Sequence, residues 1–269
     1  MGLTSTSTGA GAADTALVLR RERPDDRIVA LAGNPNVGKS TVFNALTGLR
    51  QHTGNWPGKT VTSAQGRCER GGRGYVLVDL PGTYSLMAHS AEEEVARDFL
   101  CFGGADGAVV VCDATCLERG LYLLSQAAGL LEHREEAGPM PQAVLCVNLC
   151  DEAEKKGIRI DFKALERSLG IPVTPCCGRT AKGLLTLKKL LASLAASCPC
   201  ACASCSLGSP YRRLPSAFSP KDLAAQAVTY TKEHYRKREE RLDRILTGPF
   251  TGTAVMVLLL LGIFWLTIT

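Results

Sequence analysis

A glycine-rich run that ends in lysine and serine, Gly33-Asn34-Pro35-Asn36-Val37-Gly38-Lys39-Ser40, has residue types and spacing suited to phosphate chemistry. It fits Gly-x-x-x-x-Gly-Lys-Ser, the loop that joins a strand to a helix and cradles phosphates. Its glycines let backbone N–H groups converge on phosphate oxygens, and the helix that follows adds a positive dipole. We expect Lys39 to reach the β- and γ-phosphates and the Ser40 hydroxyl to bind Mg²⁺. The predicted nucleotide-binding residues here are Gly33, Asn34, Asn36, Val37, Gly38, Lys39, Ser40 and Thr41.

A second polar group follows about forty residues later, in the turn Asp79-Leu80-Pro81-Gly82. Asp79 ends an apolar run of strand length, so its carboxylate would lie beside the phosphate loop and help hold Mg²⁺. The Gly82 N–H would then face the γ-phosphate. An Asp-x-Pro-Gly turn is common by itself, and only its position after the phosphate loop indicates this role.

The segment Asn148-Leu149-Cys150-Asp151 also follows a predicted strand, and it indicates which base is bound. The Asp151 carboxylate can accept the N1–H and the 2-amino group of guanine together, a donor pair that adenine lacks. Asn148 would brace the loop and touch the purine edge. The alternative for Asp151 is a helix cap at an ordinary strand-to-helix turn.

Residues 51–60, which follow the phosphate loop and its helix, are rich in turn residues and predict a loop that responds to the nucleotide. A threonine there can add a second hydroxyl to Mg²⁺ only while the γ-phosphate is present. Thr60 is the candidate, and Thr53 and Thr62 are its rivals. Trp56 is either a core anchor or a nucleotide contact.

Alternating strands and helices must position these groups. Apolar runs predict strands at 27–32, 74–79, 107–112, 142–148 and 171–173. Helices are predicted at 41–47, 91–102, 117–132, 162–169 and 184–194. This alternation indicates an α/β P-loop GTPase fold with a mostly parallel, six-stranded sheet flanked by helices. The polar segments fall at the carboxyl ends of the strands, where such sheets bind their ligands.

Composition sets further bounds. The 269 residues allow one α/β domain with an appendage, and a net charge of +5 gives no argument for nucleic acid, so no nucleic-acid partner is expected. Residues 1–24 are small and polar, then charged, which is typical of a disordered leader rather than a secretory signal. The 12 cysteines are expected to be mostly reduced thiols, because the phosphate loop needs cytosolic nucleotide.

After a G domain at 25–195, residues 196–218 are predicted to form a cysteine-rich linker. The thiols between Cys198 and Cys205 either bind a soft metal or belong to a flexible linker without a metal. Their spacing is not a standard zinc pattern, and no histidine accompanies them.

A helical segment is predicted at 219–248, with Ser219 as N-cap and Pro220 at the first helical position. Residues 249–269 carry no charge and come close to the ~20 residues that span a bilayer, so they are interpreted as a first transmembrane helix. The basic stretch before them predicts a cytoplasmic N-terminal side. A buried core helix is the alternative.

Together these motifs resemble the N-terminal G domain of the ferrous iron transport protein B (FeoB) family, from about Arg27 to Leu191 and again at the C-terminus. The matching stretches are Gly33 to Thr41, Gly54-Asn-Trp-Pro-Gly58 with Thr60-Val61, Asp79-Leu-Pro-Gly-Thr-Tyr-Ser-Leu86, Glu92 to Asp98, and Asn148 to Asp151. The stretches around Trp56 and Tyr84 are far more specific than a generic GTPase signature.

The resemblance implies a GTPase that binds GTP or GDP with Mg²⁺ and K⁺, and whose catalytic residues are Lys39, Thr60 and Gly82. Asn36 would help coordinate K⁺, which takes the place of an arginine finger. Thr83 stands where Ras-like enzymes carry a water-orienting glutamine, so slow hydrolysis is expected.

The family's base-binding Ser-Ala-Arg/Lys turn corresponds to Cys177-Gly178-Arg179 in this sequence. Cys177 and Gly178 would offer a backbone N–H to guanine O6. That interaction does not depend on the side chain, so guanine binding is expected despite the changed residues.

The family places a helical regulatory domain and a permease after the G domain, and here the sequence stops after one apolar segment. The chain is therefore a fragment, a split gene product or a stand-alone tethered regulator. The implied partners are guanine nucleotide, the membrane, the FeoB permease region or a separate permease subunit, and a small FeoA-like protein. An oligomer is also implied.

The predicted function is a GTP-binding, slowly hydrolysing switch on the cytoplasmic side of a bacterial inner membrane, coupled to Fe²⁺ uptake. An Era-like GTPase acting on ribosomal RNA would share the nucleotide motifs, but it should carry a basic RNA-binding domain instead of an apolar terminus. A GTP-binding regulator without hydrolysis would fit Thr83.

Overall fold

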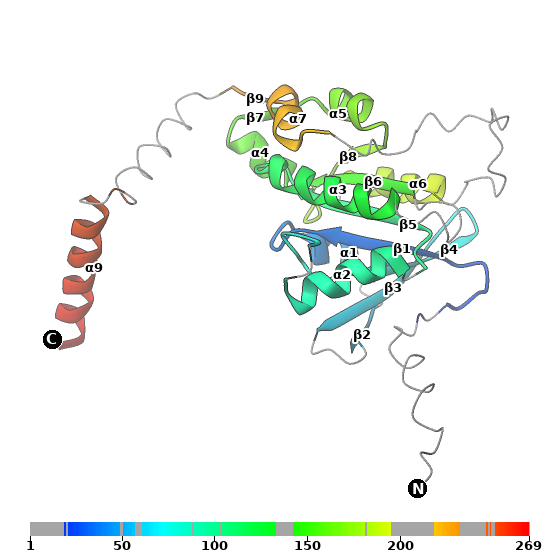
Figure 1. The fold of residues 1–269 in the computed structure, drawn as a ribbon, viewed down its shortest axis with the longest axis horizontal. Coiled ribbons are helices and arrows are strands. Elements are labelled where there is room, and N and C mark those ends of the chain that lie inside the picture. The colour runs from blue at the N-terminus through cyan, green and yellow to red at the C-terminus, as the bar shows by residue number, and fades with distance from the viewer. Residues whose placement is uncertain are drawn as a thin grey trace, which may run out of the picture.

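A seven-stranded sheet, with helices packed on both of its faces, positions the motifs (Figure 1). The strand order is β2-β3-β4-β1-β5-β6-β8. The computed structural model describes residues 19, 21–48, 51–56, 61–87, 89–102, 104–132, 142–180, 182–194, 218–231, 246, 248 and 251–268.

Five neighbouring strands form the parallel part of the sheet. They are β1 (Arg27–Gly33), β4 (Arg73–Asp79), β5 (Gly107–Asp113), β6 (Gln142–Asn148) and β8 (Val173–Pro175). The first four are rich in valine, leucine and alanine and are buried along nearly their whole length, as expected for strands covered on both faces. These four strands confirm the predictions. The fifth begins at Val173 rather than at Ile171.

The prediction of six strands is wrong, because an antiparallel pair extends the sheet beyond β4 and makes it mixed. The added strands are β2 (Gln51–Asn55) and β3 (Thr62–Arg70). Both contain many polar residues, since β2 is an edge strand and antiparallel strands need not be buried on both faces. They therefore lack the continuous apolar run from which the other strands were predicted. Residues 51–55 also turn out to be a strand rather than part of a loop.

Helices α1 (Lys39–Thr47) and α6 (Leu184–Leu194) cover one face of the sheet. Helices α2 (Ala91–Phe102), α3 (Leu117–Glu132) and α5 (Phe162–Leu169) cover the other. The alternation of side chains along β1 shows this division, because Val29 and Leu31 join the cluster under α1 while Ile28 and Ala30 join the cluster under α2. All five helices lie where the sequence predicts them.

A second, smaller sheet is formed by two strands that follow β6 in the sequence. Helix α4 (Cys150–Lys155) leads into β7 (Ile158–Ile160), which pairs antiparallel with β9 (Val228–Tyr230). Helix α7 (Pro220–Ala227) precedes β9 and packs against α3 and α5 in one buried cluster. The Ser219 side chain accepts a hydrogen bond from Asp222 N at 3.3 Å, so the predicted helix start is confirmed.

The predicted helix over 219–248 is interrupted after Ala227, and residues 232–245 of the prediction lie outside the described residues. The chain becomes extended at Val228, and Thr231 donates from its N and its Oγ1 to the Gly157 carbonyl, both at 2.8 Å. Two consecutive β-branched residues, Val228 and Thr229, favour a strand where an unpaired partner strand is available.

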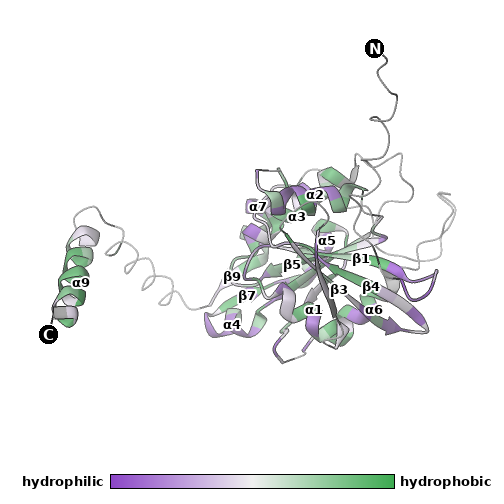
Figure 2. Ribbon diagram, turned by 90° about the horizontal axis from the view of Figure 1, so that it is seen from below, coloured by the Kyte–Doolittle hydropathy of each residue, from purple (hydrophilic) through white to green (hydrophobic). Residues whose placement is uncertain are grey.

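Helix α9 (Thr251–Ile268) is apolar and is coloured green along most of its length in Figure 2. Its 18 residues extend about 27 Å, slightly less than the ~30 Å hydrocarbon core of a bilayer. Among the described residues, no helix meets the combined length and hydrophobicity required to cross a membrane. The interpretation of 249–269 as a transmembrane helix is therefore not supported.

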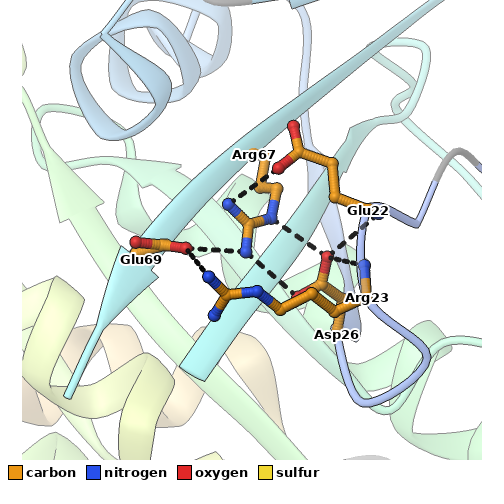
Figure 3. A network of polar contacts seen from close by, with 5 residues as sticks. All are labelled: Glu22, Arg23, Asp26, Arg67 and Glu69. Carbon is orange, nitrogen blue, oxygen red and sulfur yellow. Dashed lines mark hydrogen bonds and ion pairs between the residues drawn. The ribbon is translucent and has the colours of Figure 1, made fainter. Parts of the chain in front are cut away.

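A polar network fixes the start of β1 to β3 (Figure 3). The fully buried Asp26 carboxylate accepts hydrogen bonds from Arg67 Nε at 3.0 Å, Arg67 Nη2 at 3.3 Å and Arg23 N at 3.1 Å. Arg67 also pairs with Glu22 at 3.0 Å and with Glu69 at 2.7 Å. Burial alone would raise the pKa of Asp26, but the hydrogen bonds from Arg67 and from the backbone bring that pKa below its usual value.

Candidate nucleotide-binding site

The phosphate loop lies between β1 and α1, as the sequence predicts. Two of its residues, Asn36 at φ 64° and Gly38 at φ 79°, have left-handed backbone conformations. A Cβ on Gly33 would lie 2.6 Å from the Val111 carbonyl oxygen, and one on Gly38 would lie 2.4 Å from Asn148 Nδ2. The loop therefore needs glycine at both positions, because β5 and Asn148 approach its backbone too closely for a side chain.

The groups predicted to hold phosphate and Mg²⁺ meet at the carboxyl end of β4. Lys39 Nζ donates to Asp79 Oδ1 and to the Leu80 carbonyl. Ser40 Oγ lies 3.3 Å from Asp79 Oδ2. The side chains of Lys39 and Asp79 are only 9% and 12% exposed, so their ion pair is largely shielded from solvent. A bound phosphate would give Lys39 a new anionic partner and free Asp79 for a cation.

These oxygen donors fit Mg²⁺. The ion prefers hard oxygen ligands, and in nucleotide sites one or two carboxylates hold it together with phosphates and water. Ser40 and Asp79 supply one hydroxyl and one carboxylate. No group of three or more His, Cys, Asp and Glu side chains able to hold a metal occurs among the described residues. Ser40 and Asp79 could therefore supply part of an Mg²⁺ shell, with a nucleotide supplying the rest.

The turn after β4 lies against the phosphate loop. The Leu80 N–H donates to the Leu31 carbonyl at 3.0 Å, and the Thr83 N–H donates to the Gly33 carbonyl at 3.3 Å. An added Cβ on Gly82 would lie 3.2 Å from Pro35 Cα. Gly82 is therefore next to the loop, as its predicted role requires.

At the other end of the site, Asn148 joins two loops. Its Nδ2 donates to the Val37 carbonyl at 2.9 Å, and its Oδ1 accepts from the Gly178 N–H at 2.9 Å. Asn148 is 1% exposed. The bracing role predicted for Asn148 matches this geometry. Because its side chain is already committed to two loops, it holds the predicted phosphate and base regions at a fixed separation.

Asp151 lies in the first turn of α4, shortly after Asn148, and its side chain is 29% exposed. A hydrogen bond from the Cys177 thiol lowers the pKa of Asp151, and the Arg179 guanidinium, 3.3 Å from Oδ2, lowers it further. Oδ1 has no hydrogen-bond partner among the described residues. Oδ1 is buried, so this charged carboxylate keeps an unused acceptor that could receive a donor from a base edge.

The backbone N–H groups predicted to donate to guanine O6 are bonded to other acceptors in the structure. The Cys177 N–H donates to the Lys182 carbonyl at 2.9 Å, and the Gly178 N–H donates to Asn148. Sequence reasoning also missed the side chain of Arg179, which covers Asp151. The sequence contained a signal for this contact, because Arg179 is a basic residue in the turn that was predicted to lie near the acidic Asp151.

The remaining candidates divide into three groups. Thr60 and the segment from Cys198 to Cys205 lie outside the described residues. Thr53 and Thr62 are exposed residues of β2 and β3. Trp56 is buried against Phe99, which identifies it as a core anchor.

Comparison with known proteins gives the same picture. The family described as Ferrous iron transport protein B matches residues 27–191. The Fe(2+) transporter FeoB of Salmonella typhimurium is 42% identical over 164 residues, which are 60% of this chain and 20% of that protein. This chain therefore spans about a fifth of the length of the curated relatives it matches.

Two crystal structures of the cytosolic domain of the T. maritima FeoB iron transporter, in a GDP form and a GMPPNP form, have the same fold with a TM-score of 0.58. Each is 42% identical, and each match covers 64% of this chain and 64% of the other. The comparisons do not favour the ribosomal alternative. Because the family match covers more than half of the sequence and contains the phosphate loop, Asp79 and Asn148 to Asp151, the chain belongs to the ferrous iron transport protein B family.

Proposed function

We propose that this chain is the GTP-binding module of a ferrous iron transporter and that it hydrolyses GTP slowly to GDP and phosphate. The observation that carries this proposal is the Asn148 bridge, which ties the Val37 carbonyl of the phosphate loop to the turn beside Asp151. One site could therefore bind a triphosphate and select the base attached to it. The family membership and the nucleotide-bound forms of the T. maritima relative support the proposal.

At the phosphate end, Lys39 and the loop N–H groups would bind the β- and γ-phosphates, and Ser40, Asp79 and Thr60 would hold Mg²⁺. When bound, Mg²⁺ supplies positive charge to the phosphate oxygens. The Gly82 N–H would face the γ-phosphate. Water would attack the γ-phosphate in line, and the fixed donors would stabilise the negative charge that develops.

Hydrolysis is expected to be slow because the residue after Gly82 is threonine instead of a water-orienting glutamine. Thr83 is only 4% exposed and its N–H is bonded to Gly33, so its side chain is poorly placed to orient water. Asn36, exposed on the loop, would help bind K⁺ as a source of additional positive charge. A regulator that binds GTP without hydrolysing it is the second candidate, and the buried Thr83 is the observation that favours it.

At the base end, Asp151 would accept N1–H and the 2-amino group of guanine. Arg179 would first have to release the carboxylate. Cys177 and Gly178 line this end of the site, and their N–H groups would have to exchange partners before one could donate to O6.

The relatives are Fe(2+) transporters, so we propose that GTP binding regulates Fe²⁺ uptake at the bacterial inner membrane from its cytoplasmic side. The permease would be supplied by the rest of the transporter or by a separate subunit. A small FeoA-like protein and a second copy of the chain are further proposed partners.

The test compares wild type with Asp151→Asn for binding of GTP, ATP and xanthosine triphosphate. Wild type should prefer GTP. Xanthine carries a carbonyl where guanine has its 2-amino group, so the amide introduced by the substitution could donate to it, and the variant should change its preference to xanthosine triphosphate. Single-turnover hydrolysis with K⁺ or Na⁺ then separates a switch enzyme from a passive binder. A wild-type preference for ATP would overturn the proposal.

A further inference from the structure

Two cysteines lie next to one another near the base end of the site. Cys146 belongs to β6, and Cys176 directly follows β8, the neighbouring strand of the sheet. In the register of these strands Cys146 lies opposite Thr174, so Cys176, two residues farther along, falls on the same face. Both cysteines belong to the hydrophobic cluster under α1 and α6, and they are 0% and 2% exposed. The fold therefore brings two buried thiols together.

A hydrogen bond joins these two thiols and makes them differ in acidity. The hydrogen bond from the Cys146 thiol lowers the pKa of Cys176 below its ordinary value, although burial opposes this change. The same hydrogen bond, together with burial, raises the pKa of Cys146 well above its ordinary value. The sulfur of Cys176 is thus suited to act as a thiolate nucleophile, while Cys146 keeps its proton until a second step.

Each of the two cysteines is close in sequence to a residue that forms the base end of the site. Cys146 stands two residues before Asn148, and Cys176 stands two residues before Gly178. Asn148 Oδ1 accepts from the Gly178 N–H at 2.9 Å. The two chain segments that carry the thiols are therefore the segments that this hydrogen bond connects, and a change in the separation of the sulfurs would act on it directly.

We propose that Cys146 and Cys176 form a reversible disulfide when peroxide is present, and that this disulfide weakens nucleotide binding. The effect on the nucleotide rests on the proposed GTP-binding function, whereas the disulfide itself does not. Disulfides in cytosolic proteins are usually transient and often sense oxidants. Such a bond would make the module respond to oxidising conditions, under which Fe²⁺ uptake would fall.

The oxidation proceeds in two steps. Peroxide is close to water in size, and it reaches Cys176 when the turn after β8 opens to exchange its hydrogen-bond partners. The Cys176 thiolate attacks one peroxide oxygen, so that an S–O bond forms, the O–O bond breaks and hydroxide leaves to take up the thiol proton as water. The Cys146 sulfur then attacks the sulfenic sulfur, the S–S bond forms, the S–O bond breaks, and hydroxide leaves with the Cys146 proton as a second water. Two thiols lose two electrons, and one peroxide becomes two waters.

The geometry of the two strands explains why this bond would disturb the site. Residues in a diagonal relation on neighbouring strands have Cα atoms roughly 7–8 Å apart, whereas a disulfide holds them about 4.4–6.8 Å apart. Cys146 is paired with β5 on one side and β8 on the other. The turn after β8 is therefore the part that must move, and Gly178 moves with it away from Asn148.

Peroxide treatment followed by digestion without reductant tests the disulfide. The cysteines at 198, 200, 202 and 205 are replaced by serine so that they cannot contribute. The peptide with Cys146 should then be linked to the peptide with Cys176, and fragmentation should place the bond on these two sulfurs. Cys146→Ser and Cys176→Ser should each abolish the link. Cys116→Ser, at a partly buried thiol after β5, is the matched control and should keep it.

Calorimetric titration with GDP tests the consequence for binding. The Kd of oxidised wild type should be at least about tenfold higher than that of reduced wild type, because the groups that contact the base lose their relative placement. Dithiothreitol should restore the reduced value. Each variant is compared with its own reduced form, so a general effect of the substitution cancels. The ratio should stay near one in Cys146→Ser and Cys176→Ser and should match wild type in Cys116→Ser. If Cys146→Ser does not fold, Cys176→Ser provides the same comparison.

The coupling between the disulfide and the nucleotide must be reciprocal. Saturating GDP should therefore disfavour the disulfide by the same factor, and a tenfold effect corresponds to a reduction potential that is less negative by about 30 mV. Equilibration in dithiothreitol buffers, with and without GDP, measures this shift. A pair of thiols that only fills the core would have the same potential in both conditions.

Three results would overturn the inference while leaving the GTP-binding proposal intact. They are the lack of a link between Cys146 and Cys176, a link from either of them to another cysteine instead, and a disulfide that leaves the Kd for GDP unchanged. Reduced wild type that binds no guanine nucleotide would overturn the proposed function and the effect on affinity together. The linked peptide would then decide on the disulfide alone.

Discussion

Asn148 donates a hydrogen bond from Nδ2 to the carbonyl oxygen of Val37 at 2.9 Å, across 111 residues of sequence. Its Oδ1 accepts from Gly178 N, so one side chain sets the separation of two loops. The bridge is buried, and neither loop has to be held in place by the nucleotide alone.

Asn148→Ala should therefore lower both stability and affinity. Two hydrogen bonds are lost and their buried partners remain, so we expect about 2 kcal/mol less free energy of unfolding. The Kd for GDP should rise at least about tenfold, because phosphate and base contacts no longer form in one geometry. Urea unfolding and calorimetric titration with GDP measure the two effects. Thr229→Val, which removes an exposed hydrogen bond at 3.4 Å, is the control. An unchanged Kd would show that the bridge does not organise the site.

Arg179→Ala should strengthen GDP binding slightly. The guanidinium is 72% exposed and occupies an oxygen of Asp151 that guanine needs. Exposed ion pairs are weak, so a gain of about two- to threefold is expected at low salt, and it should disappear at high salt. Titrations at two salt concentrations measure this, with Lys182→Ala as the matched loss of a nearby positive charge. Weaker GDP binding by Arg179→Ala would indicate that Arg179 acts on the nucleotide instead.

Asp26→Asn should destabilise the fold in a pH-dependent way. The buried carboxylate pairs with Arg67, and removing one partner of such a pair costs about 3 kcal/mol at neutral pH. The pKa of Asp26 is lowered in the folded state, so its contribution is present above the ordinary carboxyl range and is lost as pH falls through the lowered value. The difference from wild type should thus shrink near pH 3. Urea unfolding at both pH values tests this, and Glu22→Gln, at a carboxylate that is 70% exposed, should have a much smaller effect.

Gly74→Ala should destabilise the same network by overpacking. A Cβ at this position would lie 1.9 Å from Asp26 Oδ1 and 2.6 Å from Arg67 Nη2. We expect a loss of about 2 kcal/mol, since the carboxylate must leave its hydrogen bonds or the strands must move apart. Gly129→Ala, on α3 with open space around it, should instead be neutral or slightly stabilising. Thermal melts of the two variants make the comparison, and equal melting temperatures would contradict it.

The parts of the molecule that sequence reasoning identified are those encoded locally. The parallel strands β1, β4, β5 and β6 are continuous apolar runs, the phosphate loop and Asp79 stand directly at strand ends, and Asp151 lies at the start of the helix that follows β6. Strands β2 and β3 were missed because, as antiparallel strands paired with their neighbours in the chain, they lack a continuous apolar run. Strands β7 and β9 were missed because pairing between segments far apart in the sequence keeps these short strands extended.

The same distinction applies within the site. Which residues bear the chemistry follows from spacing, so Lys39, Ser40 and Asp79 were found and meet in space. What each group is bonded to without a nucleotide depends on neighbouring loops. The contact of Arg179 with Asp151 and the prior engagement of the Cys177 N–H are of this second kind.

Helix α7 and strand β9 come late in the chain, yet they pack on α3, α5 and β7, close to helix α4, which contains Asp151. A shortened protein that ends near Leu191 would bare the apolar surface now beneath Leu223 and Ala227, and it would leave the edge of β7 open to pairing with another molecule. We expect such a shortened protein to aggregate when it is expressed. The shortest version that keeps this packing ends after Thr231.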